Sequence, residues 1–255
     1  MLRLINSEWL DTLTKGVKMS SVGDGIHAGH GDWSFGGDVP KTFDDHVSKS
    51  VPIYKEGHDL ICNLSDFFVK DDSVVYEIGC STGVLISRLA EHSSSKSGAR
   101  FVGVDIEASM IEHAKNNHTG VCNVEYLVED ALLIDMEPSD FIVCYYTVQF
   151  IRPSLRQQLI DKLYDSLNWG GGLVLFEKVR GVDARFQDIF TILYAEYKLD
   201  KGYAPEAILS KTLSLKGVLE PFSTQGNIDM LSRAGFKDIN TIQKYLCFEG
   251  FLAIK

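Results

Sequence analysis

Hydrophobic positions along the chain fall into two kinds of run, which alternate from about residue 73 onward. Short, nearly continuous apolar runs lie at residues 73–78, 100–105, 124–128, 140–146 and 173–176. They are rich in Val, Ile, Phe and Tyr, which indicates buried β-strands. The segments between them, such as 84–92, around 109–113 and 154–167, have helical spacing. This alternation predicts a parallel sheet covered by helices on both faces.

Other segments depart from this rhythm. Two helices, broken at Pro52, are expected between residues 39 and 68. Residues 180–225 are helical in pattern and too long for an ordinary connection, so we expect an inserted helical cap over the strand ends. A helix over 227–234 precedes strands at 239–248 and 251–254, which Glu249-Gly250 should join as an antiparallel pair. The predicted fold is α/β, mostly parallel, with an antiparallel last strand.

Residues 1–30 differ in pattern from the remainder and predict an N-terminal extension. Apolar residues between positions 2 and 13 have the spacing of one short amphipathic helix. Residues 20–25, rich in Ser and Gly, are expected to form a flexible joint. Residues 31–255 then form a single domain that contains the cap.

Composition and charge narrow the classes of protein. Hydrophobic residues make up 45% and charged residues 24%, and the net charge is −10. A uniformly basic nucleic-acid-binding surface is not expected, because phosphate contacts require clustered Lys and Arg. The five cysteines are widely spaced without a CxxC pair, which indicates neither a disulfide framework nor a metal site. No apolar run is long enough to span a membrane, and we expect a cytoplasmic protein.

A glycine-containing turn follows the first strand, and an acid ends the second. The turn reads Glu77-Ile78-Gly79-Cys80-Ser81-Thr82-Gly83, and a helix follows it. Such a turn lets the backbone approach a ligand at the N-terminus of a helix. Asp105 ends the second strand, where an acid can bind both hydroxyls of a ribose. The alternative interpretation is a structural strand–turn–helix connection.

Three classes of enzyme share this arrangement. A dinucleotide dehydrogenase is disfavoured because the glycines do not fit GxGxxG. Gly79-Cys80-Ser81-Thr82-Gly83 matches the GxSxG of an α/β-hydrolase, but that fold needs a late histidine and none follows His118. An S-adenosylmethionine enzyme needs acids after the first three strands, and Glu77, Asp105 and Asp130 occupy these places. Asp130 alone is equally explained as a helix N-cap.

From about Gly31 to Lys255 the chain resembles the carboxy-S-adenosylmethionine synthase family of class I, Rossmann-like methyltransferases. The resemblance lies in Gly31-Asp32-Trp33-Ser34-Phe35, Ser50-Val51-Pro52-Ile53-Tyr54, Gly79-Cys80-Ser81, Met110-Ile111-Glu112, Thr147-Val148-Gln149-Phe150, Leu175-Phe176-Glu177-Lys178 and Gly202-Tyr203. It implies S-adenosylmethionine as cofactor, a homodimer formed through the cap, and, for the synthase itself, prephenate as second substrate in tRNA wobble-uridine modification.

The resemblance and the motifs together give the expected cofactor site. Its residues are Tyr54, Glu77, Gly79, Cys80, Ser81, Gly83, Asp105, Ile106, Asp130, Ala131 and Tyr145. Ile106 and Tyr145 both replace an asparagine of the family. Trp33 and Phe35 either close over the cofactor or are core aromatics.

The cap contains the departure with most bearing on function. In the synthase family an arginine after the Gly-Tyr pair holds the carboxylate of the carboxylated cofactor, and alignment on Gly202-Tyr203 puts Thr212 there. Arginine is a rigid two-pronged donor to carboxylate, which threonine cannot replace. Lys211, Arg180 or Arg185 could substitute for it.

For this reason the sequence favours a methyltransferase that acts on a small-molecule acceptor by in-line transfer. Tyr145, Gln149 and Glu177 are the candidate catalytic residues; Glu177 is either a base or half of a surface ion pair with Lys178. The alternatives are the synthase itself and a non-catalytic nucleoside-binding partner protein. A tRNA methyltransferase is disfavoured by the net charge of −10.

Overall fold

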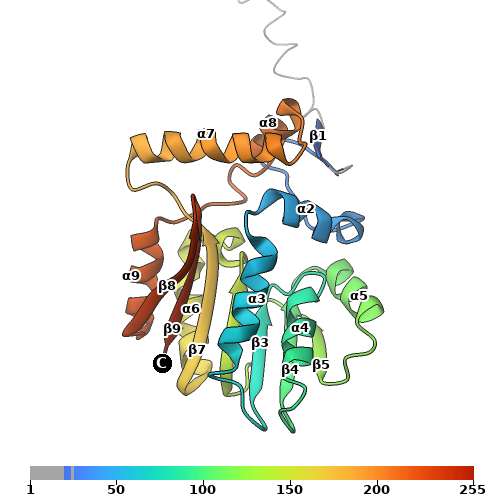
Figure 1. Ribbon diagram of the computed structural model, residues 1–255, viewed down its shortest axis with the longest axis vertical. Coiled ribbons are helices and arrows are strands. Elements are labelled where there is room, and N and C mark those ends of the chain that lie inside the picture. The colour runs from blue at the N-terminus through green and yellow to red at the C-terminus, as the bar shows by residue number, and fades with distance from the viewer. Residues whose placement is uncertain (1–19, 24–25) are drawn as a thin grey trace, which may run out of the picture.

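The computed structural model describes residues 20–23 and 26–255, and these form a seven-stranded sheet between two helical layers, with helices above one edge (Figure 1). The expected N-terminal helix lies outside the described residues. The strand order is β5-β4-β3-β6-β7-β9-β8. The strands are β3 (Val74–Ile78), β4 (Arg100–Asp105), β5 (Val124–Val128), β6 (Ser139–Tyr145), β7 (Leu167–Lys178), β8 (Asp238–Tyr245) and β9 (Phe248–Ile254).

The first five of these strands are parallel, and β9 runs antiparallel to both of its neighbours, β7 and β8. Both the mostly parallel sheet and the antiparallel last strand are thus confirmed. The chain moves outward from β3 to β5, then returns to place β6 on the other side of β3. This reversal opens a crevice at the carboxyl ends of β3 and β6, where open α/β sheets bind ligands.

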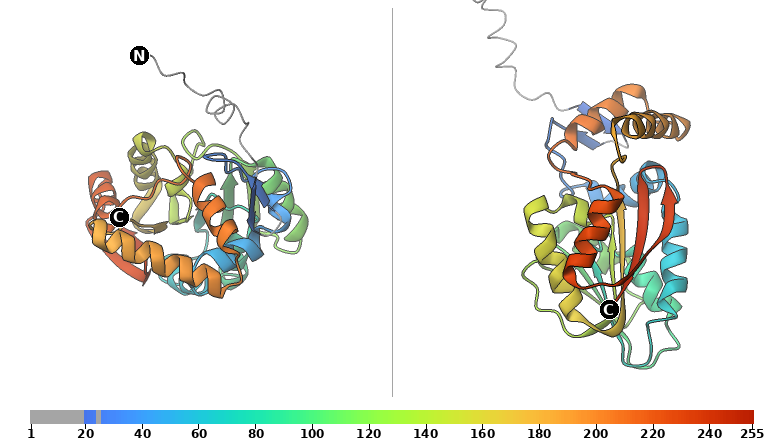
Figure 2. Two further views of the ribbon diagram at one scale, coloured as in Figure 1. Left: turned by 90° about the horizontal axis from the view of Figure 1, so that it is seen from above. Right: turned by 90° about the vertical axis from the view of Figure 1, so that its left-hand side faces the viewer.

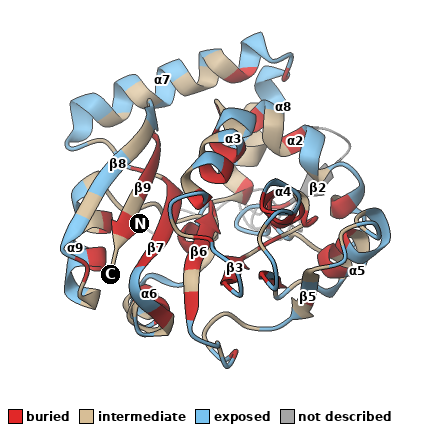
Figure 3. Ribbon diagram, turned by 60° about the horizontal axis from the view of Figure 1, so that its bottom comes forward, coloured by how far each residue is buried: buried red, intermediate tan, exposed pale blue. Residues whose placement is uncertain are grey.

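Helices cover both faces of the sheet because alternate strand residues face opposite sides (Figure 3). One face packs against α3 (Tyr54–Ser65), α4 (Val84–His92) and α5 (Ala108–Asn117), and the other against α6 (Pro153–Ser166) and α9 (Thr224–Ala234). The two cores meet in the sheet itself: Val174 and Phe176 belong to the first, and Leu173 and Leu175 to the second.

The expected helical cap is present as α7 (Ala184–Asp200) and α8 (Pro205–Ser214), which lie above the carboxyl ends of the strands (Figures 1 and 2). The break at Pro52 separates α2 (Phe43–Ser50) from α3. The 3-10 helices Val39–Lys41 and Val148–Phe150 are single turns. The segment after the N-terminal hairpin is tied to the end of α8, since Gly31 N–H donates to Leu213 O and Trp33 N–H to Ser214 O.

Two local predictions are wrong. Ser20–Gly23, expected in a flexible joint, forms β1, which pairs antiparallel with β2 (Ile26–Ala28) and lies against α8. The turn between β8 and β9 is Leu246-Cys247 rather than Glu249-Gly250, since Tyr245 pairs with Phe248. Gly250 instead allows a close approach within the sheet, because a Cβ there would lie 2.5 Å from the Phe176 ring.

Candidate functional site

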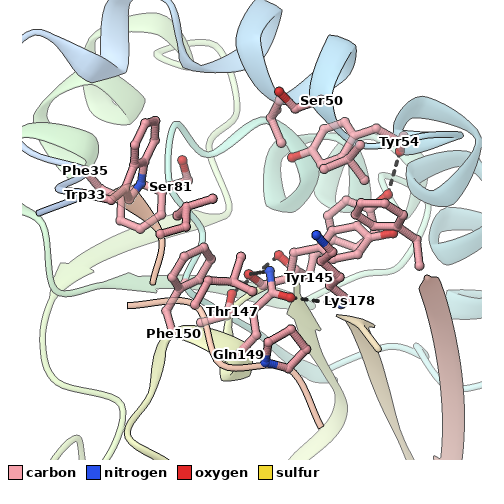
Figure 4. Close-up of a pocket in the computed structure, with 18 of the residues that line it drawn as sticks. Trp33, Phe35, Ser50, Tyr54, Ser81, Tyr145, Thr147, Gln149, Phe150 and Lys178 are labelled. Carbon is pink, nitrogen blue, oxygen red and sulfur yellow. Dashed lines mark hydrogen bonds between the residues drawn. The ribbon is translucent and has the colours of Figure 1, made fainter. Parts of the chain in front are cut away.

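A cavity of about 630 Å³ lies between the carboxyl ends of the strands and the cap (Figure 4). Its floor comes from β3, β4 and β6, one wall from α2 and α3, and its roof from α7 and α8. Trp33 and Phe35 line the cavity, and they also pack in a small hydrophobic cluster with Leu215 and Val218. Both interpretations of these aromatic residues therefore stay open. Lining residues are mainly apolar and aromatic, as in other small-molecule sites, with a few charged groups among them.

The turn after β3 makes the cavity floor. Gly79 has φ +74°, and a Cβ on it would lie 2.3 Å from Oγ1 of Thr147, so only glycine fits both the conformation and the space. Cys80 and Ser81 line the cavity beside it. Gly83, expected as a contact residue, does not itself line the cavity; its φ of +77° begins α4.

Asp105 is held in a fixed orientation at the end of β4. Its Oδ2 accepts from the N–H of Ser81 at 2.8 Å, and its Oδ1 accepts from the N–H of Glu107 at 2.9 Å. Each carboxylate oxygen keeps further lone pairs for a ligand. Burial raises the pKa of Asp105, while these backbone donors oppose the rise. The arrangement suits two vicinal hydroxyls, as expected for the ribose.

Glu77 is buried below the turn and reaches the cavity wall. Burial raises its pKa well above the ordinary value, and the charge of Asp105 adds to the rise. Its Oε2 has no hydrogen-bond partner among the described residues. A buried polar atom of this kind is costly until it is hydrogen-bonded, so Glu77 is ready to form a hydrogen bond with a ligand.

The end of β5 supplies the third expected acid. Asp130 and Ala131 line the cavity, as does Ile106 beyond Asp105. Asp130 Oδ1 accepts from the N–H of Leu132 at 2.9 Å and closes a turn, so the side chain is fixed although no helix follows it directly. Acids from three adjacent strands therefore lie along one side of the cavity, which fits a nucleoside-bearing cofactor.

Aromatic rings form the opposite side of the cavity. Tyr54 lies 5.0 Å from Tyr145 and 6.3 Å from Tyr146, measured between ring centroids. The Tyr145 hydroxyl donates to Tyr54 O at 2.6 Å, and burial raises its pKa well above the ordinary value. Tyr145 thus keeps its proton at neutral pH and packs α3 onto β6; nothing in these contacts supports its use as a base.

Gln149 and Glu177, the other two catalytic candidates, have structural contacts. The Gln149 amide donates to Tyr146 O at 3.1 Å and accepts from the N–H of Lys178 at 2.9 Å, so it joins the ends of β6 and β7 (Figure 4). Glu177 is 2% exposed and does not line the cavity. Alternation along β7 turns Glu177 toward the core beneath Val148 and Lys178 toward the cavity. The prediction of a surface ion pair between Glu177 and Lys178 is therefore wrong.

Thr212 and the three basic residues expected to be able to replace an arginine there are partly engaged elsewhere. Thr212 lines the cavity, but its hydroxyl donates to Ile208 O within α8. Lys211 contacts His46 and Ser50 and lies 5.0 Å from the Trp33 ring centroid. Arg180 pairs with Glu220 at 3.4 Å, and Arg185 does not line the cavity.

Sequence reasoning missed Lys198 of α7, which lines the cavity together with Tyr194 one helical turn before it. The i, i+4 spacing of Tyr194 and Lys198 puts both on one helix face, and this was the available signal. Which face turns toward the cavity depends on how the cap packs, and local pattern does not contain that information.

Comparisons with known proteins agree with this geometry. Residues 75–171 match the family model of a methyltransferase domain. Structural similarity extends to a putative O-methyltransferase from Nostoc punctiforme (TM-score 0.60, 20% identity, 86% of this chain and 61% of that one). It also extends to an S-adenosylmethionine-dependent methyltransferase from Aquifex aeolicus (TM-score 0.56, 18% identity, covering 84% of this chain and 97% of that one). The fold is that of the class I methyltransferases, and the cofactor is S-adenosylmethionine.

Sequence similarity is more specific. A carboxy-S-adenosyl-L-methionine synthase of Staphylococcus epidermidis is 35% identical over 224 residues, which cover 88% of this chain and 97% of that protein. A synthase of the same name from Nautilia profundicola is 36% identical over 88% of this chain and 94% of that protein. The chain belongs to the carboxy-S-adenosyl-L-methionine synthase family.

Within the described residues, no group of three or more His, Cys, Asp or Glu side chains is placed to hold a metal ion. None of the described helices combines the length and hydrophobicity needed to cross a bilayer.

Proposed function

We propose that this protein synthesises carboxy-S-adenosylmethionine, transferring a carboxyl group from prephenate to the methyl group of S-adenosylmethionine. The observation that carries the proposal is the similarity to proteins named as this synthase, which covers 88% of the chain and includes sheet and cap alike. The sequence alone favoured methyl transfer to a small molecule because Thr212 replaces an arginine. The comparisons support the synthase reading better, and methyl transfer becomes the second candidate.

When bound, S-adenosylmethionine supplies a sulfonium that makes its methyl group acidic as well as electrophilic. In the proposed reaction a methyl C–H bond breaks and a C–C bond to the transferred carboxyl group forms. The donor loses its ring carboxyl group and its ring hydroxyl group as the ring becomes aromatic. The methyl proton and that hydroxyl leave together as water, so atoms and charge balance without an oxidant.

The candidate catalytic side chains fit a reaction of this kind. Tyr145 and Glu177 are placed in packing contacts, and burial raises the pKa of both. A donor whose own departing hydroxyl takes the proton needs no base from the protein. The remaining tasks of the chain are to hold the nucleoside through Asp105 and its neighbours and to exclude water with aromatic rings.

Turnover tests the proposal. Purified protein is incubated with S-adenosylmethionine and prephenate, and the nucleoside is identified by mass spectrometry; the control omits prephenate. Carboxy-S-adenosylmethionine is expected only in the complete mixture. An unchanged cofactor in both would count against the proposal and favour methyl transfer, which the uncharged Thr212 specifically supports.

We also propose that two copies associate through the cap. The outer surface of α7 carries Phe186, Ile189, Ile192, Leu193 and Leu199, all exposed, and α8 adds exposed Leu209. One helix with so many exposed large apolar side chains is unusual for a monomer, and no other helix or strand of the described residues exposes as many. A second copy of the same helix would cover this surface symmetrically.

A further inference from the structure

Two lysines lie close to the same tyrosine ring in the cavity. Nζ of Lys178, at the end of β7, lies 4.4 Å from the Tyr194 ring centroid, and Nζ of Lys198, on α7, lies at the same distance. Both lysines and the ring line the cavity. The Tyr194 hydroxyl donates to Ser50 O at 2.8 Å, which fixes the position of the ring.

Neither ammonium group has an acidic partner within the described residues. No ion pair or side-chain hydrogen bond is present for Lys178 or Lys198, although Lys198 is only 6% exposed. Burial lowers the pKa of both, that of Lys198 to about 8. Cys247 is nearby, but burial raises the pKa of its thiol, so it stays neutral. Two adjacent, poorly solvated cations without a counter-charge are unfavourable until an anion arrives.

Four aromatic rings form a continuous row along the cavity, which begins at Tyr54 and ends at Tyr194, beside the two lysines. Centroid distances are 6.3 Å from Tyr54 to Tyr146, 5.9 Å from Tyr146 to Phe248 and 5.1 Å from Phe248 to Tyr194. Lys178 pairs with Phe248 in the β7–β9 register. The acids occupy the β3, β4 and β5 side of the crevice, and the lysines occupy the β7 side beneath the cap. One cavity therefore joins the three acids to the two lysines.

Other cations around the cavity are less available. Arg180 pairs with Glu220, and Lys211 contacts His46 and Ser50. Thr212 carries no charge. Lys216 also lines the cavity, but it is exposed, whereas Lys178 is partly buried and Lys198 is buried. A carboxylate within this largely apolar cavity requires a cation, and these two shielded lysines can supply it without breaking an ion pair within the described residues.

Resting on the proposed function, we propose that Lys178 and Lys198 together form a carboxylate-binding subsite on the β7 side of the cavity. The carboxylate belongs either to the carboxymethyl group of the product or to the second substrate. In both cases it meets two ammonium groups that lie close to the Tyr194 ring.

Binding measurements test this without turnover. Isothermal titration calorimetry compares carboxy-S-adenosylmethionine with S-adenosylmethionine on the full chain and on Lys178→Met and Lys198→Met. Loss of a charge-assisted contact predicts an approximately tenfold or greater weakening for the carboxylated ligand. Affinity for S-adenosylmethionine should stay within about twofold, since it lacks the carboxylate. Lys201→Met, at the exposed end of α7, is the matched control and should bind both as the original chain does.

A parallel titration with prephenate, in the presence of S-adenosylhomocysteine, identifies the source of the carboxylate. Weakened prephenate binding with normal carboxy-S-adenosylmethionine binding assigns the subsite to the second substrate, and the reverse assigns it to the product. Lys198→Arg keeps the positive charge, so it should retain the preference for carboxylated ligands. If Lys198 served only in packing, the charge would not matter for this preference. Unchanged affinity for both carboxylates in both Met variants would overturn the proposal.

The two proposals fail separately. If the original chain does not convert S-adenosylmethionine yet loses carboxylate affinity in the Met variants, the synthase activity is wrong and the subsite stands. If it makes the carboxylated product while the Met variants bind both carboxylates normally, the subsite is wrong and the activity stands.

Discussion

Asp105 is oriented before any ligand binds, because the backbone N–H groups of Ser81 and Glu107 hold its two oxygens. Replacement by Ala removes the acceptors for the ribose hydroxyls while leaving the cavity open. Each lost charge-assisted hydrogen bond costs about 1.5–3 kcal/mol, so we expect S-adenosylmethionine to bind at least about tenfold more weakly. Calorimetric titration measures this, with Glu112→Ala, exposed on α5, as control. Equal affinity in Asp105→Ala and the original chain would contradict the assigned role.

Glu177 gives a prediction about stability and pH. Burial raises its pKa from 4.5 to about 8, so the folded chain keeps a proton that the unfolded chain releases above about pH 4.5. Stability from this group is therefore present at low pH and is lost as pH rises toward 8. The slope contributed is about 1.4 kcal/mol per pH unit within that window.

Glu177→Gln should remove this part of the decline, because glutamine has no proton to release. Urea unfolding at several pH values between about 5 and 8 measures the free energy of unfolding. Glu137→Gln, which alters an exposed ion pair with Arg100, is the control and should leave the slope unchanged. An identical decline in Glu177→Gln would show that the carboxyl group is ionised in the folded chain. S-adenosylmethionine affinity should persist in this variant, since Glu177 does not line the cavity.

Individual side chains were predictable where the chain order decides their place. Glu77, Asp105 and Asp130 lie at or just beyond the carboxyl ends of three strands, so a parallel sheet alone brings them to one edge. Lys198 was not predictable, because its place depends on how α7 packs across the strand ends. Glu177 and Lys178 were also misjudged from the sequence. They are adjacent along the chain, but they face different sides of β7 and therefore do not pair.

At the level of elements, apolar patterning predicted the sheet strands and their helices closely. The predicted bounds 84–92, 100–105 and 124–128 coincide with α4, β4 and β5. The failure lay in the last hairpin, where Glu249-Gly250 has the composition of a turn. Gly250 is instead needed because β9 approaches the Phe176 ring closely. A glycine required by such a tertiary contact looks, in the sequence, like a glycine required by a turn.

Gly250→Ala tests that explanation. The added methyl group would lie within 2.5 Å of the Phe176 ring, and the ring is fully buried. Overpacking of this kind costs about 1–3 kcal/mol, so we expect the free energy of unfolding to fall by that amount. Gly120→Ala, where a Cβ meets nothing within 4 Å, serves as control in the same urea titration. Equal stability of Gly250→Ala and Gly120→Ala would show that β9 shifts without cost.

The whole molecule divides into a sheet domain and a cap, and the cavity lies between them. The cap's outer surface leads to a prediction about assembly. Ile192→Glu puts a charge at the centre of the exposed apolar stripe of α7, and a dimer formed there should dissociate. Sedimentation velocity measures the change in mass, with Trp169→Glu, exposed at the far end of β7, as control. A monomeric original chain, or a dimer that survives Ile192→Glu, would contradict association through this surface.

The general architecture could be derived from the sequence because alternation of strands and helices restricts the topology. The reaction was harder to predict than the fold, because one aligned position, Thr212, disfavoured the synthase activity. In the folded chain positive charges at the cavity can come from other elements, here β7 and α7, and a linear sequence does not display that placement.

The fate of the cofactor's methyl carbon tests the central claim most directly. Purified protein is given S-adenosylmethionine with an isotope-labelled methyl group together with prephenate, and the nucleoside released on denaturation is identified by mass spectrometry. Synthesis of carboxy-S-adenosylmethionine predicts that the label stays on the nucleoside, in a methylene group that carries the new carboxylate. Release of S-adenosylhomocysteine without the label, or recovery of unchanged labelled cofactor, would contradict it.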